Sequence, residues 1–375
     1  MPDVARFRAE GSPSFGRSNP ERIESSFRDW VVRGEGVENS LPILAAQAAA
    51  LLADPENEGD RQVIDWGYPP YRVREILGLE MMEAAPTWTL DRMGATLTSL
   101  DDGGLVVVAG EHEDFYDPDF HIYNDVIVFR PTGSIEFYDY PREVFPPTDF
   151  HTATRVGDRL ILIGSLSYAD DRRPGVTQLY ALDLMSFAIT PLEATGEPPG
   201  WISRHTARLE GSTIVVEGGM IHEERGDSAV YRPNFDVHAL DFETMSWSTR
   251  EIRDWKMYEI VDEGSFYYML LPEGFDTSLL RSGLEQFPDI PKMDVPLYPS
   301  DLVPEGFVDE SPQPHLLTLR LRFGSVPVKV ECSHPGIEVT VEAELPESES
   351  RAIAERIRTR LEARAGRPAR LESRF

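Results

Sequence analysis

A strand pattern that recurs every 54 residues is the feature that most constrains the fold of this chain. Three apolar stretches end on Gly110, Gly164 and Gly218, which are 54 residues apart both times. Short apolar runs bounded by glycine favour β-strands, and a fixed spacing of such strands is typical of repeat architectures. The middle of the chain is therefore predicted to consist of repeated β-units.

Further strands complete each repeat. The tripeptide His-Thr-Ala begins at both His151 and His205, one strand ahead of the second and third glycines. A polar loop follows each glycine, and a further apolar run follows each loop. In two repeats that run leads into an aspartate with a hydroxyl residue three positions later, at Asp183 and Asp241. This order predicts four strands per repeat.

The repeats resemble kelch repeats. Gly218-Gly219 is similar to the kelch glycine doublet, Ala109-Gly110 and Gly164-Ser165 are degenerate forms of it, and Trp247 matches the tryptophan of the fourth strand. The resemblance covers about residues 88–250 and implies the blades of a β-propeller. The length of the body divided by the repeat length predicts a small or irregular propeller of about five blades.

The flanking sequence divides the chain into four parts. Residues 1–58 are expected to be helical and to pack against the body, and the propeller is expected to span 59–287, with flanking stretches supplying the blades beyond the three clear repeats. A proline-rich linker is predicted over 288–314, followed by a small α+β domain at 315–375. The fold class is thus mainly β, with N-terminal helices and a C-terminal appendage.

Composition restricts the partners. The chain of 375 residues carries 36 basic and 65 acidic residues, a net charge of -29. This excess argues against binding to nucleic acid or to an anionic membrane surface, and it favours a basic partner. Cys332 is the single cysteine, and no signal-like segment or membrane-length apolar run is found. A cytoplasmic location is therefore expected.

Long loops follow all three glycines, and repeat symmetry places equivalent loops on the same rim of a propeller. Loops on a rigid scaffold are where binding residues concentrate, and tyrosine among charged residues suits recognition of a protein. The expected partner-binding residues are Glu111, His112, Asp114, Tyr116, Asp119, Tyr123, Tyr168 and Tyr231.

The first of these loops also contains a possible metal site. Glu113, Asp117 and His121 are similar to the ferrous-iron triad of the plant specifier proteins, another kelch family. Two carboxylates and an imidazole suit a divalent metal with open coordination positions. The resemblance implies a divalent metal as the one candidate cofactor, and nucleotide-binding and serine-hydrolase motifs are absent from the sequence.

Three classes of function remain open. The leading hypothesis is a non-enzymatic propeller that binds a protein partner through its rim loops, with an inhibitor or immunity protein for a basic partner as a concrete version. The alternative is a kelch-type enzyme, either a sugar mutarotase-like isomerase or an iron-dependent lyase that uses the triad. The third class is a structural blade assembly that oligomerises through its unclosed edge. His151 and His205 occupy equivalent repeat positions, so a shared structural hydrogen bond is expected for them rather than catalysis.

The metal hypothesis makes a direct prediction. Protein purified without chelators should carry about one equivalent of a divalent metal, because three ligand side chains hold it. Asp117→Ala should lose that metal, whereas Asp114→Ala, in the same loop but outside the triad, should keep it. Elemental analysis of the three proteins measures this. Equal metal content in both variants would contradict the triad.

Overall fold

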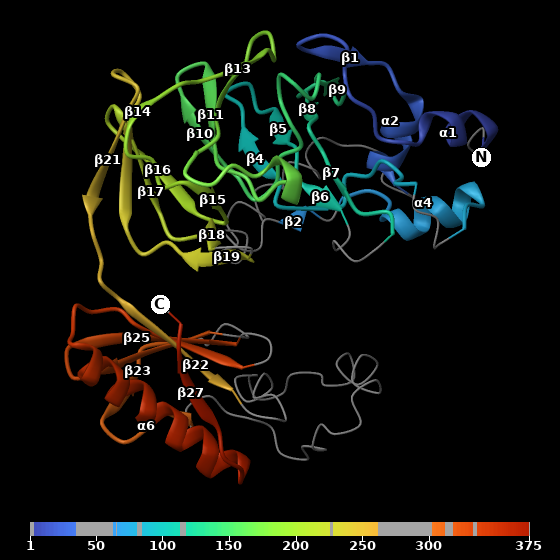
Figure 1. The fold of residues 1–375 in the computed structure, drawn as a ribbon. Helices are drawn as coiled ribbons and strands as arrows, with labels where there is room; N and C mark the ends of the chain where they lie inside the picture. Colours follow the sequence, from blue (N-terminus) through green and yellow to red (C-terminus); the bar gives the residue numbers. More distant parts are fainter. Residues whose placement is uncertain are drawn as a thin grey trace. The chain divides into compact units, whose positions relative to one another are not determined.

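The structure is a computed structural model that describes residues 4–34, 63–64, 66–80, 85–112, 118–225, 228–261, 302–311, 318–332 and 336–374. The chain forms two compact units, Met1–Ile252 and Arg253–Phe375. Both units are mainly β, as the sequence predicts (Figure 1). In the described part of the chain, no helix combines the length and the apolar character needed to cross a lipid bilayer.

Three sheets of four or five strands form the body of the N-terminal unit. The first contains β4 (Thr96–Ser99), β5 (Leu105–Val108), β8 (Val126–Phe129), β9 (Ile135–Asp139) and β1 (Glu21–Ile23). The second contains β10 (Thr152–Val156), β11 (Arg159–Ile163), β12 (Leu179–Asp183) and β13 (Ile189–Pro191). The third contains β16 (Thr206–Glu210), β17 (Thr213–Glu217), β20 (Val237–Asp241), β21 (Ser246–Glu251) and β14 (Thr195–Gly196).

The four-stranded repeat predicted from the sequence is confirmed. In each repeat the first strand pairs antiparallel with the second, and a threonine of the first faces the last residue of the second, as Thr152 faces Ile163. The residues that follow these second strands, Ala109, Gly164 and Gly218, have φ of 53°, 73° and 68°. Left-handed backbone favours glycine, which explains the doublets. The structurally equivalent positions are thus 109, 164 and 218, and Gly110 occupies the second position of its doublet.

The loops after the first and third doublets contribute strands to two smaller sheets. One contains β2 (Val63–Ile64), β3 (Arg92–Met93), β6 (Glu111–His112) and β7 (His121–Ile122). The other contains β15 (Trp201–Ser203), β18 (Met220–Arg225) and β19 (Ser228–Pro233). The second repeat instead has a short 3₁₀ helix, η3 (Ala169–Asp171). The ends of these loops are therefore held by regular backbone hydrogen bonds.

The turns between the third and fourth strands also follow the sequence. Asp183 Oδ1 accepts hydrogen bonds from the Ser186 backbone N–H and hydroxyl, both at 2.8 Å. Asp241 does the same with Thr244, at 2.9 and 3.0 Å. An aspartate can bond the backbone just beyond it in this way, and the hydroxyl three positions on adds a second donor.

The N-terminal segment packs against the first sheet, as expected. Helices α1 (Val4–Glu10), α2 (Ser26–Arg33) and α4 (Pro70–Leu77) contribute Phe7, Phe27 and Val73, respectively, to a core that also contains Leu105 and Ile127. Residues 35–58 of the segment that was expected to be helical lie outside the described residues. The helices cover an apolar face of the first sheet.

Asn19 and Pro20 do not begin a helix, although a capping side chain before a proline is typical of a helix start. Helix α2 begins instead at Ser26, where the Ser25 hydroxyl accepts a hydrogen bond from the Arg28 N–H. Asn19 Nδ2 donates a hydrogen bond to the Ile189 carbonyl of the second sheet at 2.6 Å. Asn19 Oδ1 accepts one from the Ile189 N–H at 2.9 Å. The Asn19 side chain therefore hydrogen-bonds to the backbone of Ile189, and it does not cap a helix.

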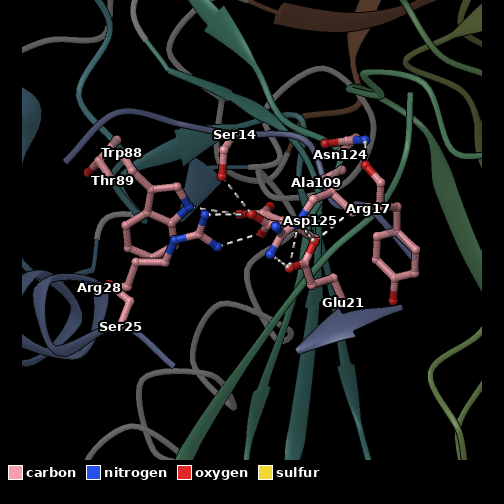
Figure 2. Close-up of polar contacts among 12 residues, drawn as sticks. Ser14, Arg17, Glu21, Ser25, Arg28, Trp88, Thr89, Ala109, Asn124 and Asp125 are labelled. Carbon is pink, nitrogen blue, oxygen red and sulfur yellow. Dashed lines mark hydrogen bonds and ion pairs between the residues drawn. The ribbon is translucent and has the colours of Figure 1, made fainter. Parts of the chain in front are cut away.

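Two buried ion pairs lie beside Trp88, and Figure 2 shows Arg28, Trp88 and Asp125 of this region. Arg28 contacts both carboxylate oxygens of Asp139, at 2.5 and 2.7 Å, and Arg92 contacts those of Asp125, at 2.6 and 2.9 Å. The Trp88 indole N–H donates a hydrogen bond to Asp125 at 2.8 Å. The guanidinium groups of Arg28 and Arg92 both lie within 5.3 Å of the Trp88 ring centre. Burial tends to raise the pKa of Asp125, but the facing Arg92 charge more than offsets this and lowers it.

The third sheet packs one face on the second sheet and carries charges on the other. Ile214, Val216 and Leu240 join the core shared with the second sheet. On the opposite face, Arg208 pairs with Glu210 and Glu217, and Arg250 pairs with Glu210 at 2.6 Å. A polar outer face is typical of the last unit in a row of stacked repeats. The described residues thus contain three such sheets, where about five blades were expected.

The C-terminal unit is a six-stranded sheet with one long helix. Its strands follow the order β23 (Phe307–Asp309), β24 (Thr318–Phe323), β25 (Val326–Cys332), β26 (Ile337–Val341), β22 (Lys256–Val261) and β27 (Arg370–Ser373). Helix α6 (Glu347–Ala365) covers one face through Ile353, Ile357 and Leu361. The expected α+β appendage is confirmed in kind but begins earlier than predicted.

Two predicted boundaries are corrected by this unit. β22 was expected to supply the propeller, but it pairs with β26 and β27 of the C-terminal sheet, so the division falls after Ile252 rather than at 287. The stretch 288–314 was expected to be a linker, yet β23 within it pairs with β24. The apolar pattern of β22 is compatible with a strand of the propeller or of the C-terminal sheet. Its pairing partners, β26 and β27, decide between the two, and they lie far along the chain.

The arginines of the C-terminal helix have partners within the unit. Arg358 pairs with Glu355 and Glu362, at 2.6 and 2.5 Å. Arg356 lies 4.3 Å from the ring centre of Phe323. These contacts account for part of the basic tail without a binding partner.

The buried ion pairs predict a large effect of one substitution. Arg28→Ala should destabilise the N-terminal unit by about 3–5 kcal/mol, because Asp139 would remain buried without its counter-charge. Arg33→Ala, on the same helix, removes a partly exposed i,i+4 pair with Asp29 and a 3.3 Å hydrogen bond to the Gly133 carbonyl, and it should cost about 1 kcal/mol. Urea unfolding followed by tryptophan fluorescence compares the two variants. Similar losses would contradict this role of the Arg28–Asp139 pair.

Candidate functional site

The predicted metal triad is only partly within the described residues. Glu113 and Asp117 lie outside them, and His121 lies on β7. The His121 ring packs edge-on against Tyr123 at 4.9 Å between centroids, and burial, together with the Arg92 charge, lowers its pKa to about 4. Among the described residues, no three His, Cys, Asp or Glu side chains form a cluster that could hold a metal. The triad stays a prediction.

Half of the expected partner-binding residues are buried. Glu111, His112, Asp119 and Tyr123 are each less than a tenth exposed, so their side chains contact the interior and form no outer docking surface. Asp114 and Tyr116 lie outside the described residues, while Tyr168 is half-buried and Tyr231 is 37% exposed. The last two are the expected residues that the structure places at the surface.

The buried members of this loop form one hydrogen-bonded network. His112 bonds the Tyr123 hydroxyl through Nδ1 at 2.6 Å and the Asp119 carbonyl through Nε2 at 3.0 Å. The Arg92 guanidinium lies 3.4 Å from the Tyr123 ring centre, which continues the network into the Asp125 ion pair. Burial, followed by the charges of His121 and Arg92, lowers the pKa of His112 to about 3. A neutral imidazole therefore holds the loop in place at neutral pH.

Aromatic and arginine side chains gather instead at the edge where the second strands end. We call this group the rim patch, and its members are Phe15, Phe120, Arg142, Tyr168, Arg172 and Tyr231. Arg142 lies 5.7 Å from the Phe15 ring centre and 5.9 Å from that of Tyr168, and the Phe120 and Tyr168 rings meet edge-on at 5.8 Å. Arg172 lies 5.4 Å from the Tyr231 ring centre and donates to its hydroxyl.

The rim patch joins the loops of three successive repeats. The Ile122 N–H of the first repeat donates to the Tyr168 hydroxyl of the second at 2.8 Å. Arg172 of the second repeat reaches Tyr231 of the third, and it also bonds the Leu166 and Ser167 carbonyls of its own loop. The loops are thereby fixed relative to one another, which gives a preorganised surface.

Sequence reasoning identified the tyrosines of the rim patch but missed its other members. Arg172 stands in the second long loop, where its pairing with a tyrosine 59 residues later has no local signal. Phe15 and Arg142 come from outside the loops after the glycines. Arg142 is 44% exposed on its side chain and pairs with Asp171 at 2.5 Å. Only the folded chain brings these residues together.

A fully buried carboxylate lies next to the rim patch. Asp149 Oδ1 accepts hydrogen bonds from the Ser167 N–H at 2.6 Å and the Ser165 hydroxyl at 3.1 Å. Burial raises the pKa of Asp149, although its hydrogen bonds and the charge of Arg204 act to lower it.

The two repeat histidines have the structural role expected of them. His151 Nε2 bonds the Thr96 hydroxyl and His205 Nε2 bonds the Thr152 hydroxyl, both at 3.0 Å. Each contact links a sheet to the sheet before it, so the bond lies between repeats rather than within one. Burial lowers the pKa of both histidines to about 3, with the charge of His205 adding to the effect on His151.

The comparisons with known proteins find similarity among solved structures alone. No protein-family model matches the chain, and no curated protein matches it. One solved structure, titled "Structure of YjhT", is similar over 42% of this chain and 70% of that chain, with 13% identity and a TM-score of 0.27. A similarity this weak carries no argument about fold or function.

The buried histidines predict how stability depends on pH. The unfolded chain takes up protons on His151 and His205 near pH 6.5, whereas the folded chain does so only near pH 3. The free energy of unfolding should therefore fall as pH is lowered from 6.5, by up to about 1.4 kcal/mol per pH unit for each histidine.

Two variants test this assignment. His205→Gln should reduce the slope of the unfolding free energy against pH by up to about 1.4 kcal/mol per pH unit, because one titrating group is lost. Thr152→Val removes the same hydrogen bond but keeps the titrating ring, so its slope should stay close to that of wild type. Urea unfolding between pH 4.5 and 7.5 measures both. An unchanged slope in His205→Gln would show that His205 does not titrate as described.

Proposed function

We propose that the N-terminal unit is a kelch-type β-propeller, or an open part of one, built from the three repeats. Three features support this proposal: the four-stranded antiparallel sheets, the left-handed doublets that end their second strands, and the histidine contacts between successive sheets. Repeats of this kind present their loops at one edge, where they can act together.

We further propose that this unit is a non-enzymatic binding protein that holds a protein partner at the rim patch. The observation that carries the proposal is the convergence of tyrosine, phenylalanine and arginine from three repeats on one partly exposed surface. Tyrosine and arginine dominate the energetics of protein interfaces. Because the loops already contact one another, little conformational entropy is lost on binding.

The charge of the chain indicates what kind of partner fits. A net charge of -29 steers basic proteins toward this molecule and repels acidic ones. At the rim patch itself, Arg142 is paired with Asp171, so this arginine does not oppose the overall acidity. A basic protein whose activity is blocked when it is covered, as by an inhibitor or immunity protein, is the partner class we propose.

Substitutions in the rim patch test this function. The double variant Arg172→Ala, Tyr231→Ala should weaken retention of the partner at least about tenfold, because it removes an aromatic and arginine anchor pair. Affinity capture from lysate of the source cells, with tagged wild-type and variant chains at 0.15 M salt, measures this retention.

A matched control comes from the opposite end of the same repeats. Met185 is 81% exposed in the turn after β12, and Met185→Ala should leave retention unchanged. Circular dichroism should show that both variants are folded. Partner retention by the double variant at the wild-type level would rule out the rim patch as the docking surface.

A further inference from the structure

We infer that His222 makes docking at the rim patch sensitive to pH, so that the patch releases its partner when this buried imidazole takes up a proton. This regulation rests on the proposed binding function, whereas the protonation of His222 can be measured without a partner. Three features of the residue carry it: its place between two aromatic side chains, its burial and its unpaired ring nitrogen.

His222 lies on β18, where the loops of the second and third repeats meet. In the strand register it faces Tyr231 of β19 on one side and Trp201 of β15 on the other. The Tyr231 hydroxyl accepts a hydrogen bond from Arg172. The Trp201 indole N–H donates to the Leu166 carbonyl at 3.2 Å. Both strand neighbours of His222 are thus attached to the loop of the second repeat.

A proton on His222 would place two positive charges against one tyrosine. The His222 ring centre lies 5.3 Å from that of Tyr231, and the Arg172 guanidinium carbon lies 5.4 Å from the same ring centre. Like charges this close repel, and the repulsion is stronger where water is excluded. Protonation of His222 therefore works against the Arg172–Tyr231 contact, which joins the second repeat to the third in the rim patch.

The surroundings of His222 also disfavour a charged ring. The residue is 6% exposed, and among the described residues its buried Nδ1 has no hydrogen-bond partner. A neutral imidazole can hold a lone pair on that nitrogen, but an imidazolium must place an N–H there without an acceptor. An unpaired donor inside a protein costs free energy, and a charged one costs more. The neutral form is therefore the one that fits the folded patch.

The charged groups around His222 act in both directions. Burial has the largest effect and lowers the pKa of His222, and the charge of Arg172 from the second-repeat loop lowers it further. Glu224, two residues later on β18, acts to raise it. The groups that act on the neighbouring Tyr231, or that pair across β18 and β19, are Asp149, Arg204, Glu223 and Arg232.

The direction of the pH dependence follows from the lowered pKa. When the patch opens, His222 returns to water and to its ordinary pKa of about 6.5. The intact patch binds the proton less readily, so its stability is full above pH 6.5 and is lost as pH falls from 6.5 through the lowered value. Within that window, the ratio of intact to open patch should fall by up to about tenfold per pH unit.

NMR titration of the full-length chain with isotope-labelled histidine tests the protonation without a partner. The His222 signal, identified by its loss in His222→Gln, should titrate below pH 6.5. Arg172→Ala should raise this pKa, because a like charge is removed, and Arg172→Gln serves the same purpose if the alanine variant does not fold. Arg142→Ala removes a rim-patch arginine that contacts Phe15 and Tyr168 and is the matched control, so it should leave the pKa unchanged.

Two results of the titration would overturn the inference. One is a wild-type pKa for His222 at or above 6.5. The other is the same pKa in wild type and in the Arg172 variants, which would show that burial alone sets it and that the residue is not linked to the rim patch.

The link to docking is tested with the protein that wild type captures from lysate. Retention by wild type should weaken between pH 7.5 and pH 5.5, and retention by His222→Gln, which stays uncharged, should not. His238→Gln is the matched control. His238 is also buried and has an unpartnered Nδ1 among the described residues, but it faces Val216 and Thr249 rather than Tyr231. It should keep the wild-type response.

The outcomes separate the two proposals. Parallel weakening in wild type and His222→Gln would overturn the regulation, even if the titration shows a lowered pKa. Failure of any protein to bind at the rim patch would refute the proposed function, while the titration would still decide whether His222 is coupled to Arg172.

Discussion

Two arginine–aspartate pairs packed around Trp88 are the interaction on which the N-terminal unit depends. An ion in a protein interior is tolerated only with an opposite charge and full hydrogen bonding, so each pair allows essentially one arrangement of its segments. Arg28 attaches helix α2 to the end of β9, and Arg92 attaches β3 to the start of β8. Arg92 also supports Tyr123, and Tyr123 supports His112. The loop of the first repeat, between His112 and Tyr123, is therefore held by the same network that attaches helix α2 to the first sheet.

Repetition explains how a binding surface arises from this scaffold. Each sheet contacts the one before it through an equivalent histidine–threonine bond, so successive loops emerge at a fixed offset along one edge. The loops of successive repeats then contact one another through the Ile122–Tyr168 and Arg172–Tyr231 hydrogen bonds, so together they form one surface. The buried Asp149 anchors the loop of the second repeat through Ser165 and Ser167. The scaffold supplies rigidity and the loops supply recognition, and this division of roles is what favours a binding function over a purely structural one.

Much of the repeat architecture could be predicted, because it is set by local preferences. Left-handed backbone at Gly164 and Gly218 and the aspartate turns at Asp183 and Asp241 each act within a few residues. The domain boundary could not be predicted in this way. β22 has an apolar pattern that suits either sheet, and its partners, β26 and β27, lie about 80 or more residues later. Contacts between distant residues also limited the prediction of the rim patch. Tyr168 and Tyr231 were expected as partner-binding residues, whereas Phe15 and Arg142 were not.

The sequence by itself determined the repeat period, the four-stranded units, the mainly β class and the acidic character of the chain. These follow from spacing and composition, which need no knowledge of neighbours. Only the tertiary structure decided which polar residues of the loops face the interior and which face a partner. His112 and Asp119 look like surface residues in the sequence, yet they are buried because Tyr123 and Arg74 supply their interactions. Burial of a polar group depends on compensating partners, and those partners are brought close only by the fold.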